Sequence, residues 1–193
     1  GLSLSENTFA SWSDGSNNYA PGSTYTMGAA NTVLTAVWTP ITRTVTFDLN
    51  GGIGDAPAQL SKSNTQTFLL STSTGFSYQG FTFAGWTTNA NGTGTTYTNK
   101  QSITLFAGIT VYAKWNANTY AVTFGSNTAS GSTHPSLGMP NQNFSAGTPF
   151  NLSTSVWYKD GHDFIGWSAT TGVATVLYTP NQSVTLFGNT TIY

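Results

Sequence analysis

Hydrophobic and polar residues alternate strictly over a short stretch in the first half of the chain. Val45, Phe47 and Leu49 lie on one face, and polar residues lie on the other. This alternation of β-branched and aromatic residues predicts a half-buried strand. Residues 50–52 (Asn-Gly-Gly) follow and supply the positive φ angles of a tight turn. The same alternation returns in residues 120–124, so a second copy of this strand is expected there.

Further short strands are predicted after this one. Residues 68–73 match residues 150–155, and residues 81–86, 103–105 and 111–115 also have strand-like patterns. Helical periodicity is weak throughout, and the pattern leaves room for at most one short helix, between Ser71 and Gln79. The prediction is therefore a mainly β fold with little helix, with loops at residues 51–58, 89–94 and 126–138.

These elements form a repeated unit. The segment Phe83-Ala84-Gly85-Trp86 returns as Phe164-Ile165-Gly166-Trp167, and a degraded copy lies at residues 9–12. Internal repetition of this length predicts a tandem array of small domains of roughly 77–81 residues. We place the C-terminal half of a first repeat at 1–39, a complete second repeat at 40–117, and a third repeat that lacks its last few residues at 118–193. The half-repeat is completed either by upstream sequence or by strands from another molecule.

The links between the units are brief. Pro40 lies in the first link, and only a few residues separate the strands that flank each link. Short, proline-stiffened links restrict bending, so we expect an extended, semi-rigid array.

Composition narrows the classes of function. The chain has 14% aromatic and 6% charged residues, no cysteine and a net charge of −1. Nucleic-acid binding needs a basic surface, so neither nucleic acid nor an anionic membrane surface is an expected partner. No apolar run approaches the length of a membrane span. The composition suits a secreted bacterial protein at the cell surface.

The repeated motifs resemble those of a known family. Residues 45–52 (Val-Thr-Phe-Asp-Leu-Asn-Gly-Gly), residues 81–86 and residues 111–115 together resemble the Listeria–Bacteroides repeat, also called the internalin B-repeat type. The resemblance implies β-grasp-like modules arranged in tandem in secreted or surface-anchored bacterial proteins. The third repeat departs from the pattern at the Gly125-Ser126-Asn127 turn and at His162, where the second repeat has Phe81.

Most aromatic residues recur at equivalent repeat positions, which is typical of a structural core. The predicted core residues are Phe47, Phe83, Trp86, Trp115, Phe124, Phe164 and Trp167. Trp157 aligns only roughly with Phe76, and it is followed by Tyr158 and a Lys-Asp-Gly turn. We therefore predict a surface contact at Trp157, Tyr158 and His162.

Catalytic chemistry is not expected. The acidic residues mostly neighbour glycines or lie in turns, where aspartate favours turn formation. Residues 160–163 contain one histidine and two aspartates, which is a poor ligand set for a metal. His134 has no visible acid or nucleophile partner, and no cofactor motif occurs. A covalent Lys–Asn cross-link is disfavoured because Lys100 corresponds to Gly22 and Asn181 in the other repeats.

The sequence thus predicts a non-catalytic spacer, stalk or surface-assembly segment of a secreted or cell-surface bacterial protein, which could be associated with an adhesin. One alternative is an adhesive module that binds a glycan or a host protein through loop aromatics. A second alternative is a filament subunit assembled by strand complementation. The expected partners are neighbouring repeats of the same chain and, in the alternatives, other copies, a glycan or a host protein.

Overall fold

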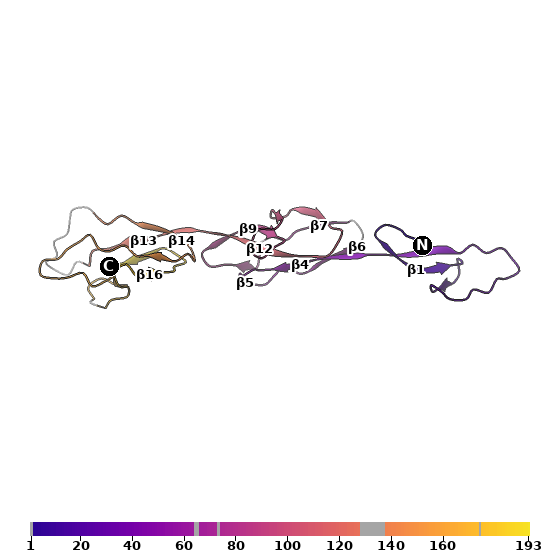
Figure 1. The fold of residues 1–193 in the computed structure, drawn as a ribbon, viewed down its shortest axis with the longest axis horizontal. Coiled ribbons are helices and arrows are strands. Elements are labelled where there is room, and N and C mark those ends of the chain that lie inside the picture. The colour runs from indigo at the N-terminus through magenta and orange to yellow at the C-terminus, as the bar shows by residue number, and fades with distance from the viewer. Residues whose placement is uncertain (1, 64–65, 73, 128–137, 174) are drawn as a thin grey trace. The chain divides into compact units, whose positions relative to one another are not determined.

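A computed structural model describes residues 2–63, 66–72, 74–127, 138–173 and 175–193. All regular secondary structure in these ranges is β, and Figure 1 labels strands along the chain. The described residues between Ser71 and Gln79, where the sequence left room for a short helix, contain strand β8 (Phe76–Ser77) and no helix. The mainly β prediction is confirmed, whereas the likeness to β-grasp domains stays a prediction. Most of the predicted loop 126–138, with His134, lies outside the described residues.

The N-terminal segment is a three-stranded antiparallel sheet with the order β2-β1-β3. Its strands are β1 (Asn7–Ser13), β2 (Asn18–Tyr19) and β3 (Thr35–Pro40). The Phe9 ring contacts the rings of Trp12 and Trp38 at centroid distances of 5.3 and 5.6 Å. No described residue before Ile41 is fully buried. These three short strands alone provide too little apolar surface to enclose a core.

A hydrogen-bonded turn closes the β1–β2 hairpin. The Asp14 carboxylate accepts bonds from the Ser16 and Asn17 backbone N–H groups at 2.8 and 2.7 Å, and from the Tyr19 hydroxyl at 2.6 Å. These three donors stabilise the ionised carboxylate. The Tyr19 hydroxyl and the two N–H groups lower the pKa of Asp14 to about 2.

The second repeat is built on a five-stranded sheet with the order β10-β9-β12-β4-β6. Two-stranded ribbons, β7–β11 and β5–β8, accompany it. Strand β4 is parallel to β12, with Phe47 opposite Val111, and Phe68 of β7 is opposite Ile103 of β11. The strands are β4 (Thr42–Asp48), β5 (Ile53–Gly54), β6 (Leu60–Ser63), β7 (Thr67–Leu69), β8, β9 (Phe81–Thr87), β10 (Thr96–Tyr97), β11 (Ser102–Thr104) and β12 (Ile109–Ala117).

The third repeat uses equivalent strand pairs. Strand β13 is parallel to β17, with Phe124 opposite Ile192, and Phe150 of β15 is opposite Val184 of β16. These are the residues that occupy the positions of Phe47, Val111, Phe68 and Ile103 in the second repeat. The strands are β13 (Thr119–Phe124), β14 (Gln142–Ser145), β15 (Phe150–Asn151), β16 (Ser183–Val184) and β17 (Thr190–Ile192).

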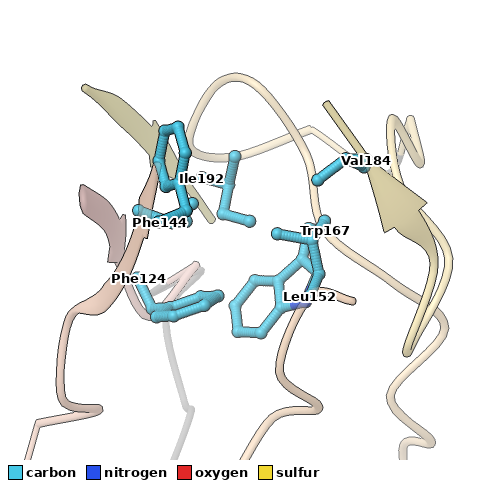
Figure 2. Close-up of a cluster of buried hydrophobic side chains, with 7 residues drawn as sticks. Phe124, Phe144, Leu152, Trp167, Val184 and Ile192 are labelled. Carbon is cyan, nitrogen blue, oxygen red and sulfur yellow. The ribbon is translucent and has the colours of Figure 1, made fainter. Parts of the chain in front are cut away.

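One core cluster fills the third repeat. The rings of Phe124 and Trp167 lie 4.7 Å apart, and Figure 2 shows them facing each other beside Leu152. Val122, Phe144, Val184 and Ile192 complete the cluster. The alternating residues of β13 therefore point one face inward, as the sequence pattern predicts.

The segment Phe164–Trp167 differs from its counterpart in the second repeat. Residues 81–87 form strand β9, whereas residues 164–167 contain only one bridge, from Trp167 to Tyr178. In the second repeat β9 pairs with the nine-residue strand β12, which continues to Ala117. In the third repeat β17 ends at Ile192, and Tyr193 exchanges two backbone hydrogen bonds with Ser168.

The chain divides into two compact units. One comprises residues 1–76 and 84–114, and the other comprises residues 77–83 and 115–193. The predicted boundaries 1–39, 40–117 and 118–193 follow the sequence repeat, and they stay predictions.

Candidate functional site

The two best-buried tryptophans are held in the same way in successive repeats. Trp86 is fully buried, and its Nε1 donates a hydrogen bond of 3.0 Å to the Ser71 carbonyl oxygen. Trp167 is 1% exposed and donates an equal bond to the Ser153 carbonyl oxygen. A buried indole N–H needs such a partner, because burying it unpaired is costly.

The other predicted core residues lie at different depths. Phe47 and Phe124 are each 6% exposed, and Phe83 and Trp115 are half-buried. Phe164 differs from the expectation of a core residue, because 39% of it is exposed. Its counterpart Phe83 lies 5.7 Å from the ring of Trp115 in an edge-to-face arrangement.

The three residues predicted to make a surface contact line one groove in the third repeat. The groove has a volume of about 480 Å³, and Trp157, Tyr158 and His162 all contribute to its wall. Phe164 and Ile165 lie on the same wall. The three residues thus lie together at one groove, and the surface contact itself stays a prediction.

The Trp157 side chain packs on the core and is also partly exposed. Its ring lies 6.3 Å from that of Trp167 in an edge-to-face arrangement, and it is half-buried. The equivalent Phe76 is 8% exposed and lies 5.7 Å from Trp86. Tyr158 is 64% exposed. Tyr158 is therefore the ring in this groove that is best placed to stack on an incoming molecule.

The His162 side chain is used within its own turn. The His162 backbone N–H donates to the Lys159 carbonyl oxygen at 3.0 Å, and Nδ1 lies 2.9 Å from the Asp160 carbonyl oxygen. Gly161 has a φ of 69°, which a tight turn favours. Across the described ranges no three His, Cys, Asp or Glu side chains are grouped to hold a metal ion. The segment 159–162 is thus a hydrogen-bonded turn at the rim of the groove.

Apolar side chains in the groove were missed by sequence reasoning. Ile165 is 62% exposed and Val176 is 38% exposed, and both line the groove. A usable signal was present, because Ile165 replaces Ala84 of the second repeat with a larger apolar residue. The groove therefore suits the flat apolar face of a ligand or an apolar side chain.

The lysines considered for a covalent cross-link contact oxygen atoms in the second repeat. Lys62 Nζ donates to the Thr67 carbonyl oxygen at 2.6 Å, and Lys114 Nζ donates to Thr96 Oγ1 at 3.4 Å. Lys100 lies in a turn with a φ of 59°. The ammonium groups of Lys62 and Lys114 thus bond to threonine oxygens, and neither of these partners is an asparagine.

Equivalent backbone hydrogen bonds form at the two links between repeats. In the first unit the Ile41 N–H donates to the Glu6 carbonyl oxygen at 3.0 Å. In the second unit the Asn118 N–H donates to the Gly80 carbonyl oxygen at 2.9 Å. Glu6 and Gly80 both have positive φ angles, 60° and 82°. Each link is therefore hydrogen-bonded to the residue just before a strand, Glu6 before β1 and Gly80 before β9, and that residue has a positive φ angle.

Each link has its own additional contacts. The Glu6 carboxylate forms an ion pair with the Arg43 guanidinium, and both side chains are largely buried. At the second link Thr82 Oγ1 donates to Asn118 Oδ1 at 2.6 Å, and a Cβ on Gly80 would lie 2.8 Å from the Ala146 Cβ. Glycine is therefore required at position 80 by both conformation and space.

A family model describes this repeated geometry. The Listeria-Bacteroides repeat domain matches residues 44–114 and again residues 120–193. The chain belongs to the Listeria–Bacteroides repeat family. The two matches coincide with the two sets of strands that bury Trp86 and Trp167, and members of the family are found in bacterial surface proteins.

A relative of this Listeria–Bacteroides repeat chain is described as a Gly-rich membrane protein of Evansella cellulosilytica. It is 32% identical over 136 residues, which cover 62% of this chain and 15% of the relative. No solved structure matches the chain. Within the described ranges there is no helix with the length and apolar character to span a membrane.

Proposed function

We propose that this chain is a non-catalytic structural segment, a spacer or surface-assembly module, of a secreted or cell-surface bacterial protein that takes part in adhesion. The observation that carries the proposal is the equivalent structural role of Trp86 and Trp167 in successive repeats. Both are buried and both donate to a serine carbonyl, so the most distinctive side chains serve the framework in each repeat. Residues used in this way hold a fold together and are not available for chemistry.

The links support a spacer. Glu6 and Gly80 accept the same backbone hydrogen bond with the same sign of φ, although their side chains differ. A backbone bond that recurs through such a change supports links of defined conformation. A spacer needs such links, because a flexible linker shortens its mean end-to-end distance.

Small-angle X-ray scattering of the 193-residue chain tests the spacer role. A globular protein of this length has a radius of gyration of about 16 Å. The proposal predicts a value well above this one and a distance distribution with an extended tail. A value close to that of a globular protein would count against a spacer.

A second candidate function is adhesion to a glycan or host protein through the groove of the third repeat. The observation that favours it is the gathering of Trp157, Tyr158 and His162 at one groove. Aromatic rings stack on the apolar faces of sugars, and Tyr158 is exposed enough to do so. Because Trp157 packs on Trp167, the variant Tyr158→Ala separates binding from folding better than a Trp157 variant does.

A glycan array probed with the unmodified chain, Tyr158→Ala and Phe106→Ala tests this function. Phe106 is 74% exposed and lies in the second repeat, outside the groove, so its variant is the matched control. Adhesion through the groove predicts binding that Tyr158→Ala abolishes and Phe106→Ala preserves. An array without signal would exclude adhesion to a glycan, and equal binding by both variants would exclude the groove as its site.

The third function, assembly of filaments by strand complementation, rests on the N-terminal half-repeat. Its three-stranded sheet has no fully buried residue in the part that the structure describes. Strand addition from another molecule would enlarge its core. Electron microscopy of the concentrated chain tests this function, because filaments would support it and dispersed particles would exclude it.

A further inference from the structure

The second repeat contains two asparagine–glycine pairs whose surroundings differ. Asn50-Gly51 directly follows strand β4, apart from Leu49, and Asn91-Gly92 lies in the loop between β9 and β10. The backbone nitrogen of the residue after an asparagine can attack the asparagine side chain, and glycine has no side chain to hinder that attack. The contacts of each pair therefore decide which of the two asparagines is open to this reaction.

The Asn50 side chain is fixed by hydrogen bonds. Its Nδ2 donates to the carbonyl oxygens of Ala90 and Ala113 at 2.9 and 3.0 Å, and its backbone N–H donates to the Asp48 carboxylate at 2.7 Å. The residue is also half-buried. Turning the Asn50 amide toward the Gly51 nitrogen would break both side-chain bonds, so the surroundings oppose the reaction at this pair.

The Asn91 side chain is exposed and is folded back over the peptide that follows it. Its Oδ1 accepts hydrogen bonds from the Thr93 N–H at 3.0 Å and from Thr93 Oγ1 at 2.6 Å. The bond to the Thr93 N–H closes a ring that contains both the Gly92 nitrogen and the Asn91 amide carbon. A Cβ on Gly92 would meet nothing within 4 Å, so the surroundings of this residue are open.

The two donors of Thr93 also match the charge that develops during the attack. When the Gly92 nitrogen bonds to the Asn91 amide carbon, Oδ1 becomes an oxyanion, and donors already aimed at that oxygen stabilise it. The Gly92 N–H itself donates to the Asn89 carbonyl oxygen at 2.9 Å. The turn therefore opens at this one bond before the nitrogen attacks.

We propose that Asn91-Gly92-Thr93 is a site of spontaneous deamidation, at which the Thr93 donors activate the Asn91 amide. The Gly92 nitrogen bonds to the amide carbon, the bond from that carbon to Nδ2 breaks, and the proton of the Gly92 nitrogen leaves with Nδ2 as ammonia. Water then opens the resulting succinimide at either of its carbonyls, which gives aspartate or isoaspartate. The reaction adds one negative charge to a chain whose formal net charge is −1.

The two products differ in their effect on the second repeat. Aspartate at position 91 keeps an oxygen acceptor for the Thr93 donors. Isoaspartate leads the backbone through the former side chain and adds a methylene next to Ala90, whose carbonyl oxygen accepts the Asn50 hydrogen bond. Isoaspartate should therefore loosen the contact of Asn50 with this loop. The inference stands whether or not the chain is a spacer.

The test incubates the folded 193-residue chain at neutral pH and follows the peptides that contain residues 50 and 91 by mass spectrometry and isoaspartate labelling. Asn91 is expected to react first, and unfolding in guanidinium chloride should bring Asn50 to a similar rate. Thr93→Val removes the hydroxyl donor and should slow the folded-state reaction at Asn91 by about threefold to tenfold. Thr93→Ser keeps the hydroxyl and should keep the rate.

The variant Thr95→Val is the matched control for Thr93→Val. It makes the same side-chain change at an exposed residue of the same loop, and it retains the backbone bonds of Thr95 with Thr88. Its rate at Asn91 should equal that of the unmodified chain. Equal rates for Thr93→Val and Thr95→Val, or a folded chain in which Asn50 reacts as fast as Asn91, would overturn the proposal. An unreacted Asn91 in the folded chain, under conditions that convert it in the unfolded chain, would also overturn it.

Discussion

The indole Nε1 of Trp86 donates a 3.0 Å hydrogen bond to the backbone carbonyl oxygen of Ser71. The two residues lie on different segments of the second repeat, so this bond fastens the segment after β7 to strand β9. Trp167 and Ser153 form the same bond in the third repeat. The tryptophan at this position is thus both the largest core side chain and a specific tie between two segments.

Replacing this tryptophan with phenylalanine tests both roles. Trp86→Phe and Trp167→Phe each remove apolar volume and leave a serine carbonyl without its donor. We expect the free energy of unfolding to fall by about 2–4 kcal/mol for either variant. Urea denaturation measures the loss. The control Phe106→Ala, at a residue that is 74% exposed, should change stability by less than about 0.5 kcal/mol.

The glycine before each tryptophan is predicted to be irreplaceable. Gly85 and Gly166 have φ angles of 124° and 148°, and a Cβ on either would collide with the carbonyl oxygen of Tyr97 or Tyr178. We expect Gly85→Ala and Gly166→Ala to cost about 3 kcal/mol or more. Gly188→Ala is the control, because a Cβ there meets nothing within 4 Å. Similar thermal unfolding of all three variants would contradict the close approach.

Replacing Lys100 with glycine should stabilise the second repeat. Its φ is 59°, and the equivalent residues of the other two repeats, Gly22 and Asn181, have φ angles of 79° and 58°. A lysine in the left-handed region carries a conformational cost that glycine avoids and asparagine partly avoids. Lys100→Gly is expected to stabilise the second repeat by about 0.5–1 kcal/mol, with a smaller gain for Asn181→Gly. Chemical denaturation should show this order, and a loss of stability in Lys100→Gly would contradict it.

The N-terminal hairpin should weaken in acid. The Tyr19 hydroxyl and the Ser16 and Asn17 N–H groups lower the pKa of Asp14 from its ordinary value of 3.8 to about 2. A lowered pKa in the folded state adds stability above the unfolded pKa, and this stability is lost as pH falls from about 4 to about 2. Nuclear magnetic resonance of the Tyr19 signals should follow this transition. Asp14→Asn should remove the transition, and an unchanged profile in that variant would contradict the assignment.

Alternation in the sequence is enough to predict which faces are buried. Val45 and Phe47 share one predicted inward face, and the structure leaves them 0% and 6% exposed. The repeat also predicts that Trp86 and Trp167 occupy equivalent positions. Both results follow because strand periodicity and burial are local properties of the sequence.

Contacts between segments that are distant in the sequence are not predictable in this way. The bond from Trp86 to the Ser71 carbonyl and the ion pair between Glu6 and Arg43 depend on how distant segments meet. The exposure of Phe164 escapes prediction for a related reason. Recurrence indicates a core residue, but its burial depends on a ring from the neighbouring strand, which Trp115 supplies to Phe83.

The central proposal is that the repeats act as a spacer with restricted links. The chain has no cysteine, so Ser16→Cys, Asn91→Cys and Thr171→Cys place spin labels at exposed sites in the three predicted repeats. Double electron–electron resonance on the three pairs measures the distances between the labels. The account predicts narrow distributions, with the distance from 16 to 171 longer than either neighbouring distance. Broad distributions, or a distance from 16 to 171 shorter than the other two, would contradict it.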